Sequence, residues 1–226
     1  MKVCGCLLDA EPADLPQLLG TSEVDLVEWR LDAFITRYGH PGTLEMLGAL
    51  GLSPRRPVLV TNRPKRQGGF YDGPEAERLG ILEAAVRLGA EWVDLEGDVE
   101  RGGRERLRGR GARVLVSHHD FSHTPETAVL QGIARNLAAG ADGIKIVTTA
   151  RRHQDCWSVL GLIPWGREEL QVDVVAFCMG TPGRWSRVAS LLLGSPWTYV
   201  RLADGPEAAP GQYTAAEMRT LLEMLA

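Results

Sequence analysis

The chain has 226 residues, of which 44% are apolar and 24% charged, and its formal net charge is −4 at pH 7. This length and composition favour one globular domain over residues 1–226. The weak negative charge and the lack of a membrane-length apolar stretch argue against nucleic acid and membranes as partners.

The N-terminal apolar run ends at Asp9 and is too short for a signal peptide. The cysteines lie mostly in apolar, strand-like stretches without C-x-x-C spacing, which is typical of reduced, buried thiols. We therefore expect a cytoplasmic protein. The cysteines are Cys4, Cys6, Cys156 and Cys178.

Runs rich in β-branched residues alternate with stretches of helical periodicity along the chain. We expect strands near Val3–Leu8, Asp25–Asp32, Pro57–Arg63, Trp92–Glu96, Arg113–His119, Gly143–Thr148, Val172–Cys178 and Trp197–Leu202. We expect helices over Pro16–Leu19, Thr43–Leu50, Glu75–Leu88, Thr124–Ala138, Asp155–Leu162, Trp185–Leu193 and Thr214–Leu225.

Several helix boundaries are marked by suitable residues. Thr124 before a proline is typical of a helix start, Thr214 and Glu217 match a capping box, and Gly194 can end a helix. The basic run from Arg101 to Arg113 gives the weakest helix prediction. Its glycines and lack of aromatic side chains favour a solvated helix and turn over a nucleic-acid site.

Eight strands about thirty residues apart, each followed by a crossover, match a βαβ unit repeated until a barrel closes. A doubly wound open sheet is the alternative, but no G-x-G-x-x-G follows the first strand and there is no P-loop. We predict an α/β fold, a single (β/α)8 TIM barrel, with its chemistry at the carboxyl ends of the strands.

The second predicted strand carries Glu28, Arg30 and Asp32, spaced two residues apart and therefore on one face, while Trp29 and Leu31 face the helices. Charges inside a barrel are costly unless they pair with one another or bind a polar ligand. A buried ion-pair network is therefore the alternative to a binding site, above all for Arg30 and Asp32.

The next two predicted strands add further polar groups. Arg63 ends the third strand, before a loop in which Gln67 and two glycines could close over a ligand. The fourth strand carries Asp94 and Glu96 on one face.

The fifth predicted strand ends in His118 and His119, of which one points inward and the other toward the helices. After the seventh strand, Arg184 and Arg187 lie near a helix start and suit a carboxylate or a phosphate. Gln212 follows the eighth strand and offers a neutral donor and acceptor at the barrel mouth.

Lys145 lies in the sixth predicted strand, where alternation turns it inward, away from Ile144 and Ile146. The chain has three lysines and twenty-two arginines, so this lysine is unlike the common cation of the chain. A desolvated amine can lose its proton and attack a carbonyl, whereas a guanidinium stays charged. The alternative is a lysine that reaches water or pairs with a carboxylate.

An amine, an imidazole and several cations around one cavity suit imine formation with a small ketone. The protonated imine withdraws electrons and acidifies the adjacent C–H, and histidine is the natural base at neutral pH. The carbanion could then expel a β-hydroxyl group or break a C–C bond, and residue types alone do not choose between these outcomes.

Seven motifs, in this order, resemble type I 3-dehydroquinate dehydratase of the shikimate pathway: E-W-R-L-D, T-N-R-P-K-R-Q-G-G, V-D-L-E, S-H-H-D-F-S-H-T-P, A-D-G-I-K-I, M-G-T-P-G-R-W-S-R and A-A-P-G-Q. The resemblance covers nearly the whole chain. It implies a Schiff-base barrel that removes water from 3-dehydroquinate to give 3-dehydroshikimate, with no metal and no organic cofactor, commonly as a homodimer.

By motif match, the resemblance implies that Lys145 forms the imine with the ring ketone. His119 would take the ring proton and then help the hydroxyl group leave as water. The remaining residues would bind the substrate: Glu28, Arg30 and Arg63 at the ring hydroxyls, and Arg187 and Gln212 at the carboxylate.

Two positions depart from the pattern of many relatives. Gln67 stands where they have a glutamate, so the imidazole lacks an anion that could orient it; Asp94 or Glu96 could supply one. Ala208 stands where they have a serine, which removes a hydrogen bond to substrate at a cost of about 1 kcal/mol. We expect the enzyme to remain active.

Three other functions compete with this one. A sugar-phosphate aldolase or transaldolase would use Lys145 and a phosphate site in the loop of residues 180–187. A metal-dependent hydrolase would use His119 and His123, which share helical spacing but which a strand end and a loop would separate. A binding protein that has lost catalysis would explain the two departures, yet the amine and the imidazole are both present.

Overall fold

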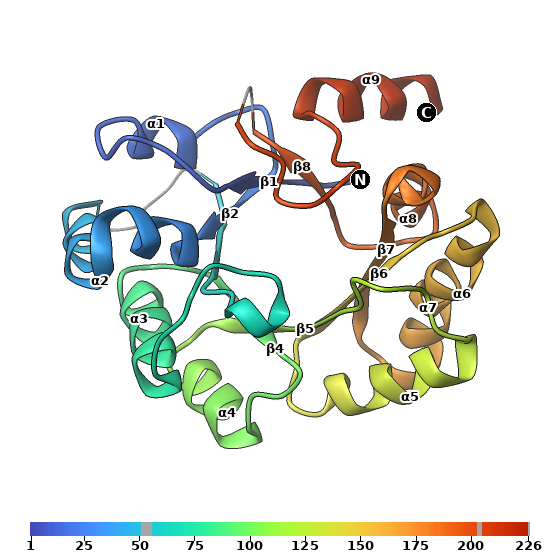
Figure 1. Cartoon of the computed structure of the whole chain (residues 1–226), viewed down its shortest axis with the longest axis horizontal. Coiled ribbons are helices and arrows are strands. Elements are labelled where there is room, and N and C mark those ends of the chain that lie inside the picture. The colour runs from blue at the N-terminus through green and yellow to red at the C-terminus, as the bar shows by residue number, and fades with distance from the viewer. Residues whose placement is uncertain (51–55, 203–204, 226) are drawn as a thin grey trace.

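The computed structural model describes residues 1–50, 56–202 and 205–225. Within them, eight parallel strands pair side by side and curve into a barrel surrounded by helices (Figure 1). From β1 to β7 each strand pairs with the next along the chain, and β8 pairs with β1. Within the described residues, no pairing joins β7 to β8. The predicted α/β barrel is therefore confirmed, with a ladder that stays open at one seam.

All eight predicted strands are present, two of them with the predicted bounds. The second strand is shorter than predicted because the chain turns into a helix directly after Arg30. The strands are β1 (Val3–Leu7), β2 (Leu26–Arg30), β3 (Val58–Thr61), β4 (Trp92–Glu96), β5 (Arg113–His119), β6 (Gly143–Thr149), β7 (Asp173–Met179) and β8 (Thr198–Arg201).

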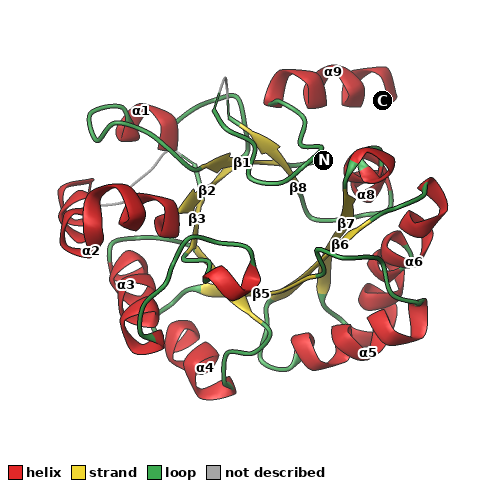
Figure 2. Cartoon of the chain, viewed as in Figure 1, coloured by secondary structure: helices red, strands yellow, loops and turns green. Residues whose placement is uncertain are grey.

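Helices cover the outside of the barrel (Figure 2). Gly39, with φ 72°, interrupts α2, and the part after it contains the predicted helix Thr43–Leu50. The weakest prediction, a helix in the basic run, is confirmed as α4. The helices are α1 (Leu15–Leu19), α2 (Leu31–Leu50), α3 (Glu75–Arg87), α4 (Arg101–Gly109), α5 (Thr127–Ala138), α6 (Cys156–Leu160), α7 (Leu162–Trp165), α8 (Ser186–Leu192) and α9 (Ala215–Leu225).

Two of the three predicted helix boundaries are confirmed. The amide of Thr214 donates to Glu217 Oε2 at 2.8 Å and the amide of Glu217 donates to Thr214 Oγ1 at 3.1 Å, which is a capping box. Gly194, with φ 97°, follows α8. The prediction for Thr124 is wrong: α5 begins at Thr127, and the Thr124 hydroxyl instead donates to the carbonyl of Thr149 at 3.1 Å.

Alternation along the strands sorts side chains between two cores. Ile144 and Ile146 belong to the larger core between sheet and helices, whereas Lys145 points into the barrel. The barrel interior holds a smaller apolar cluster that includes Leu26 and Trp92. Among the described residues, no helix combines the length and the apolarity needed to cross a membrane.

Candidate active site

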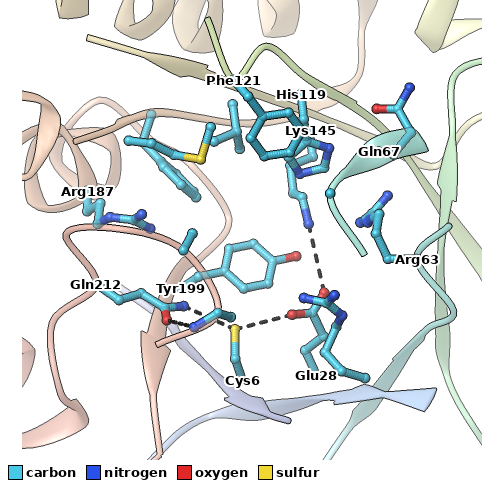
Figure 3. A pocket seen from close by; sticks show the side chains of 17 residues that line it. Cys6, Glu28, Arg63, Gln67, His119, Phe121, Lys145, Arg187, Tyr199 and Gln212 are labelled. Atoms are coloured by element: carbon cyan, nitrogen blue, oxygen red, sulfur yellow. Dashed lines mark hydrogen bonds and ion pairs between the residues drawn. The ribbon is translucent and has the colours of Figure 1, made fainter. Parts of the chain in front are cut away.

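A pocket with an empty volume of about 520 Å³ lies at the carboxyl ends of the strands (Figure 3). Its position is the one at which a (β/α)8 barrel collects reactive side chains. All seven site residues predicted from the sequence line it, although they come from three strands, one helix and two loops. They are Glu28, Arg30, Arg63, His119, Lys145, Arg187 and Gln212.

Lys145 is buried and lies among acidic and aromatic groups. Its Nζ donates to Asp94 Oδ2 at 2.6 Å, lies 3.8 Å from Glu28 Oε1 and stands 4.5 Å from the centroid of the Tyr199 ring. The amine is therefore in an ion pair rather than in the purely apolar environment expected from the strand sequence. The sequence left two possibilities for Lys145, a reactive amine that faces a cavity and a lysine paired with a carboxylate. The structure combines them, since Lys145 pairs with Asp94 and also lines the pocket.

Asp94 is the residue that holds this amine in place. Its carboxylate also accepts hydrogen bonds from Arg63 at 2.7 Å and from Ser117 Oγ at 2.6 Å. Burial alone would raise the pKa of Asp94, but the charges of Arg63 and Lys145 outweigh it and hold that pKa well below its usual range. Asp94 stays ionised and fixes the direction of the amine.

Of the two histidines that end β5, His119 faces the pocket. Its ring stacks on Phe121 with centroids 5.9 Å apart. Burial, followed by the positive charges of Arg63 and Lys145, lowers the pKa of His119 well below 6.5. The imidazole is therefore neutral at pH 7 and can accept a proton.

The suggestion that Asp94 or Glu96 orients the imidazole is not supported. Asp94 hydrogen-bonds Lys145, Arg63 and Ser117, and Glu96 pairs with Arg63 at 2.6 Å and with Arg78 at 2.7 Å. The Nδ1 atom of His119 has no hydrogen-bond partner among the described residues.

Arg187 is fully buried, and no carboxylate pairs with it within the described part of the chain. Its guanidinium stacks 4.4 Å from the centroid of Phe177 and donates to the carbonyl of Pro210 at 3.3 Å, while its Nε has no partner there. Burial lowers the pKa of Arg187 to about 10. A buried cation with unused donors is a site for an anionic group.

The expected partner of this arginine, Arg184, lies outside the pocket. It stacks on Tyr213 and lies 3.4 Å from the carboxylate of Glu217. Of the two arginines predicted after the seventh strand, only Arg187 lines the pocket.

Arg30 and Asp32 form the buried ion pair that the sequence left open. Arg30 Nε donates to Asp32 Oδ1 at 2.9 Å and Arg30 Nη2 donates to Oδ2 at 2.8 Å. Asp32 does not face the barrel as predicted, because it lies in the first turn of α2 and accepts the amide of Phe70 at 3.0 Å. It holds Arg30 and the neighbouring loop in position.

The loop after β3 packs too closely for side chains at its two glycines. A Cβ at Gly69 would lie 2.0 Å from the carbonyl oxygen of Arg63, and Gly68 has φ 74° with a would-be Cβ 2.4 Å from the Phe121 ring. This close packing lets Gln67 line the pocket, as the sequence suggested.

Several pocket residues were not predicted as functional, among them Cys6, Phe177, Met179 and Tyr199. Each faces the interior by strand alternation, which was the available signal. Cys6 differs from the others because its sulfur hydrogen-bonds both Glu28 and Gln212.

The two histidines proposed for a metal site lie apart, since His119 lines the pocket and His123 is exposed beside Asp120. In the three described stretches of the chain, no group of three His, Cys, Asp or Glu side chains could hold a metal ion.

Comparison with known proteins gives a consistent result over the whole chain. A sequence model of the family described as Type I 3-dehydroquinase matches residues 7–226. The 3-dehydroquinate dehydratase of Syntrophobacter fumaroxidans is 46% identical over 224 residues, covering 99% of this chain and 96% of that protein. The enzyme of the same name from Thermococcus gammatolerans is 38% identical over 208 residues, covering 89% and 88%.

The fold also matches that of a solved structure of an enzyme with this name. The crystal structure of 3-dehydroquinate dehydratase from Geobacillus kaustophilus superposes with a TM-score of 0.88 at 27% identity, covering 99% of this chain and 90% of that one.

Proposed function

Since the chain belongs to the type I 3-dehydroquinase family and is a 3-dehydroquinate dehydratase, we propose that Lys145 and His119 carry out the elimination. The observation that supports this assignment is the shared pocket, in which a buried amine held by Asp94 and a neutral imidazole face one cavity. Membership of this family rules out the three other functions considered from the sequence, which were an aldolase, a metal-dependent hydrolase and a binding protein.

The reaction begins when Nζ of Lys145, after giving up a proton, attacks the ring ketone. The C–N bond forms, the carbonyl oxygen leaves as water with two of the three protons of the ammonium group, and a protonated imine remains. His119 removes a proton from the adjacent ring carbon, and the electron pair moves to the imine nitrogen as an enamine. The enamine returns its electrons, the β-hydroxyl group leaves, and the proton on His119 completes a water molecule.

Hydrolysis of the imine then releases 3-dehydroshikimate and restores the amine of Lys145. The imine itself takes up the electrons, so this sequence requires neither a metal nor an organic cofactor. Asp94 keeps Lys145 directed into the pocket before the attack and stabilises the cationic imine after it.

Substrate orientation follows from charge. We assign the substrate carboxylate to Arg187, with Gln212 beside it, because this buried guanidinium has unused donors. Glu28, Arg30 and Arg63 line the same pocket and suit the ring hydroxyl groups, since they offer both acceptors and donors. Trapping of the wild-type enzyme with borohydride and 3-dehydroquinate, followed by intact-mass measurement, tests the imine.

Replacing Arg187 with alanine is expected to raise KM by about 10-fold to 100-fold, with a smaller effect on kcat, since a charge-assisted hydrogen bond is lost. Steady-state kinetics measure both constants. Arg184→Ala is the matched control, because Arg184 pairs with Glu217 outside the pocket and its removal should leave KM unchanged. An unchanged KM in Arg187→Ala would remove Arg187 from the carboxylate site.

We also propose that the enzyme is a cytoplasmic homodimer. All four cysteines are free and buried, which suits a reducing compartment. Trp157 in α6 is 66% exposed and contacts the Trp185 ring edge to face, and Leu192 at the end of α8 is 54% exposed. Large apolar side chains on neighbouring helices suit contact with a second copy of the chain.

Light scattering of the purified protein is expected to give twice the mass of one chain. Trp157→Glu should shift that mass toward the monomer by placing a charge in the interface. A wild-type protein that stays monomeric at micromolar concentration would contradict the proposed dimer.

A further inference from the structure

Three polar groups from distant parts of the sequence form a hydrogen-bonded chain beside the pocket (Figure 3). The thiol of Cys6, in β1, donates to Glu28 Oε2 at 3.2 Å, and Nε2 of Gln212 donates to Cys6 Sγ at 3.3 Å. Gln212 belongs to the loop between β8 and α9, where its Oε1 accepts the amide of Ala208 at 2.8 Å. The sulfur therefore joins β2 to that loop.

We propose that Cys6 is a positioning residue for this reaction, whose thiol sets the spacing between Glu28 and Gln212. The inference rests on the proposed function, in which Glu28 contacts the ring hydroxyls and Gln212 contacts the carboxylate. Cys6 lies between the two groups that bind opposite ends of one small substrate, so it determines how both ends are held at once.

Each hydrogen bond of the thiol fixes an atom that would otherwise be free to turn. Oε2 of Glu28 receives its hydrogen bond from this thiol, whereas Oε1 receives one from Thr61 at 2.8 Å. The amide of Gln212 could rotate about its last torsion if Nε2 lost the sulfur acceptor, because that torsion has a broad, roughly two-fold profile. The thiol thus selects one orientation of the amide.

The environment keeps Cys6 in the form that this role requires. Burial, and then the negative charge of Glu28, raises the pKa of the Cys6 thiol well above 9.0. The sulfur therefore keeps its proton at neutral pH and can donate to a carboxylate. It is unsuited to act as a nucleophile, because a nucleophilic cysteine reacts as the thiolate.

Three variants separate positioning from packing. Cys6→Ala removes both hydrogen bonds and is expected to raise KM about 3-fold to 10-fold with kcat within about 2-fold of wild type. Cys6→Ser keeps a donor and an acceptor and should hold KM within about 3-fold of wild type. Cys4→Ala removes an equally buried thiol from the same face of β1, outside the pocket lining, and should leave KM unchanged.

KM does not depend on the fraction of the enzyme that is folded, so it separates positioning of the substrate from loss of stability. A merely structural role would lower the melting temperature of Cys6→Ala and Cys4→Ala alike without changing either KM. The inference is overturned if Cys6→Ala has the KM of wild type, or if Cys6→Ser has the KM of Cys6→Ala.

A double-mutant cycle tests whether the thiol acts through Gln212. If it does, the variant carrying both Cys6→Ala and Gln212→Ala has the KM of Gln212→Ala alone. If the KM of the double variant instead rises by the product of the two single-variant increases, the proposed coupling between Cys6 and Gln212 is overturned. If Gln212→Ala leaves KM unchanged, the assignment of Gln212 to the substrate carboxylate fails. If Gln212→Ala raises KM but Cys6→Ala has the KM of wild type, only the role of Cys6 is overturned.

Discussion

Replacing Lys145 with alanine is expected to abolish turnover and the adduct that borohydride traps with 3-dehydroquinate. No other residue in the pocket carries a primary amine, since the remaining lysines are Lys2 and Lys65, which are exposed and do not line it. Without the lysine amine, no imine forms with the ring ketone. The adjacent ring C–H is then not acidified and no enamine can form. Intact mass and peptide mapping identify the modified residue.

Alanine at this position also removes the partner of a buried carboxylate, so loss of activity could reflect loss of structure. Lys145→Arg controls for this, because a guanidinium can pair with Asp94 but does not form the imine. It should melt near the wild-type temperature and still give no adduct. Lys2→Ala should behave as wild type, and an adduct mapped away from Lys145, or wild-type turnover in Lys145→Arg, would refute the assignment.

The barrel could be predicted because its signals are local. Each strand is a short β-branched run, and the period of two placed Lys145 inward and Ile144 outward, as the structure confirms. The same rule predicted that one residue of the pair His118 and His119 faces the pocket. It could not say which, because the answer depends on the register of β5 against β6.

The errors arose where a tertiary contact decided the local structure. Asp32 continued the alternation of β2, but the chain had already turned into α2, where Asp32 pairs with Arg30. Thr124 has the chemistry of a helix cap, yet its hydroxyl binds the neighbouring β6. Arg184 and Arg187 share one motif, and only the packing of α8 directs one inward and the other outward.

The sequence also could not show how the site is held together. Asp94 and Lys145 are 51 positions apart, and Cys6 and Gln212 are 206 apart, so neither hydrogen bond has a local signature. Barrel closure brings β1 beside β8 and makes the second contact possible. Motifs pointed to the groups that we propose to react, whereas the groups that hydrogen-bond them became evident only from the fold.

Replacing His119 with alanine is expected to slow turnover by about 10²-fold to 10⁴-fold, the usual share of general acid–base catalysis. Lys145 and Asp94 remain in place in this variant, so borohydride should still trap an adduct with substrate. The combination of a trapped imine and slow product formation separates the base from the nucleophile. His118→Ala is the matched control, because His118 adjoins His119 and lies outside the pocket lining.

The pH profile gives a second test of the role proposed for His119. Because the pKa of His119 lies well below 6.5, its neutral form persists as the pH falls to that value, so kcat/KM should decline only below about pH 6.5. The His119→Ala variant should lose this acidic limb while Lys145 still reacts with substrate. A limb centred above pH 6.5 in the wild type, or one that survives the substitution, would assign proton removal to another group.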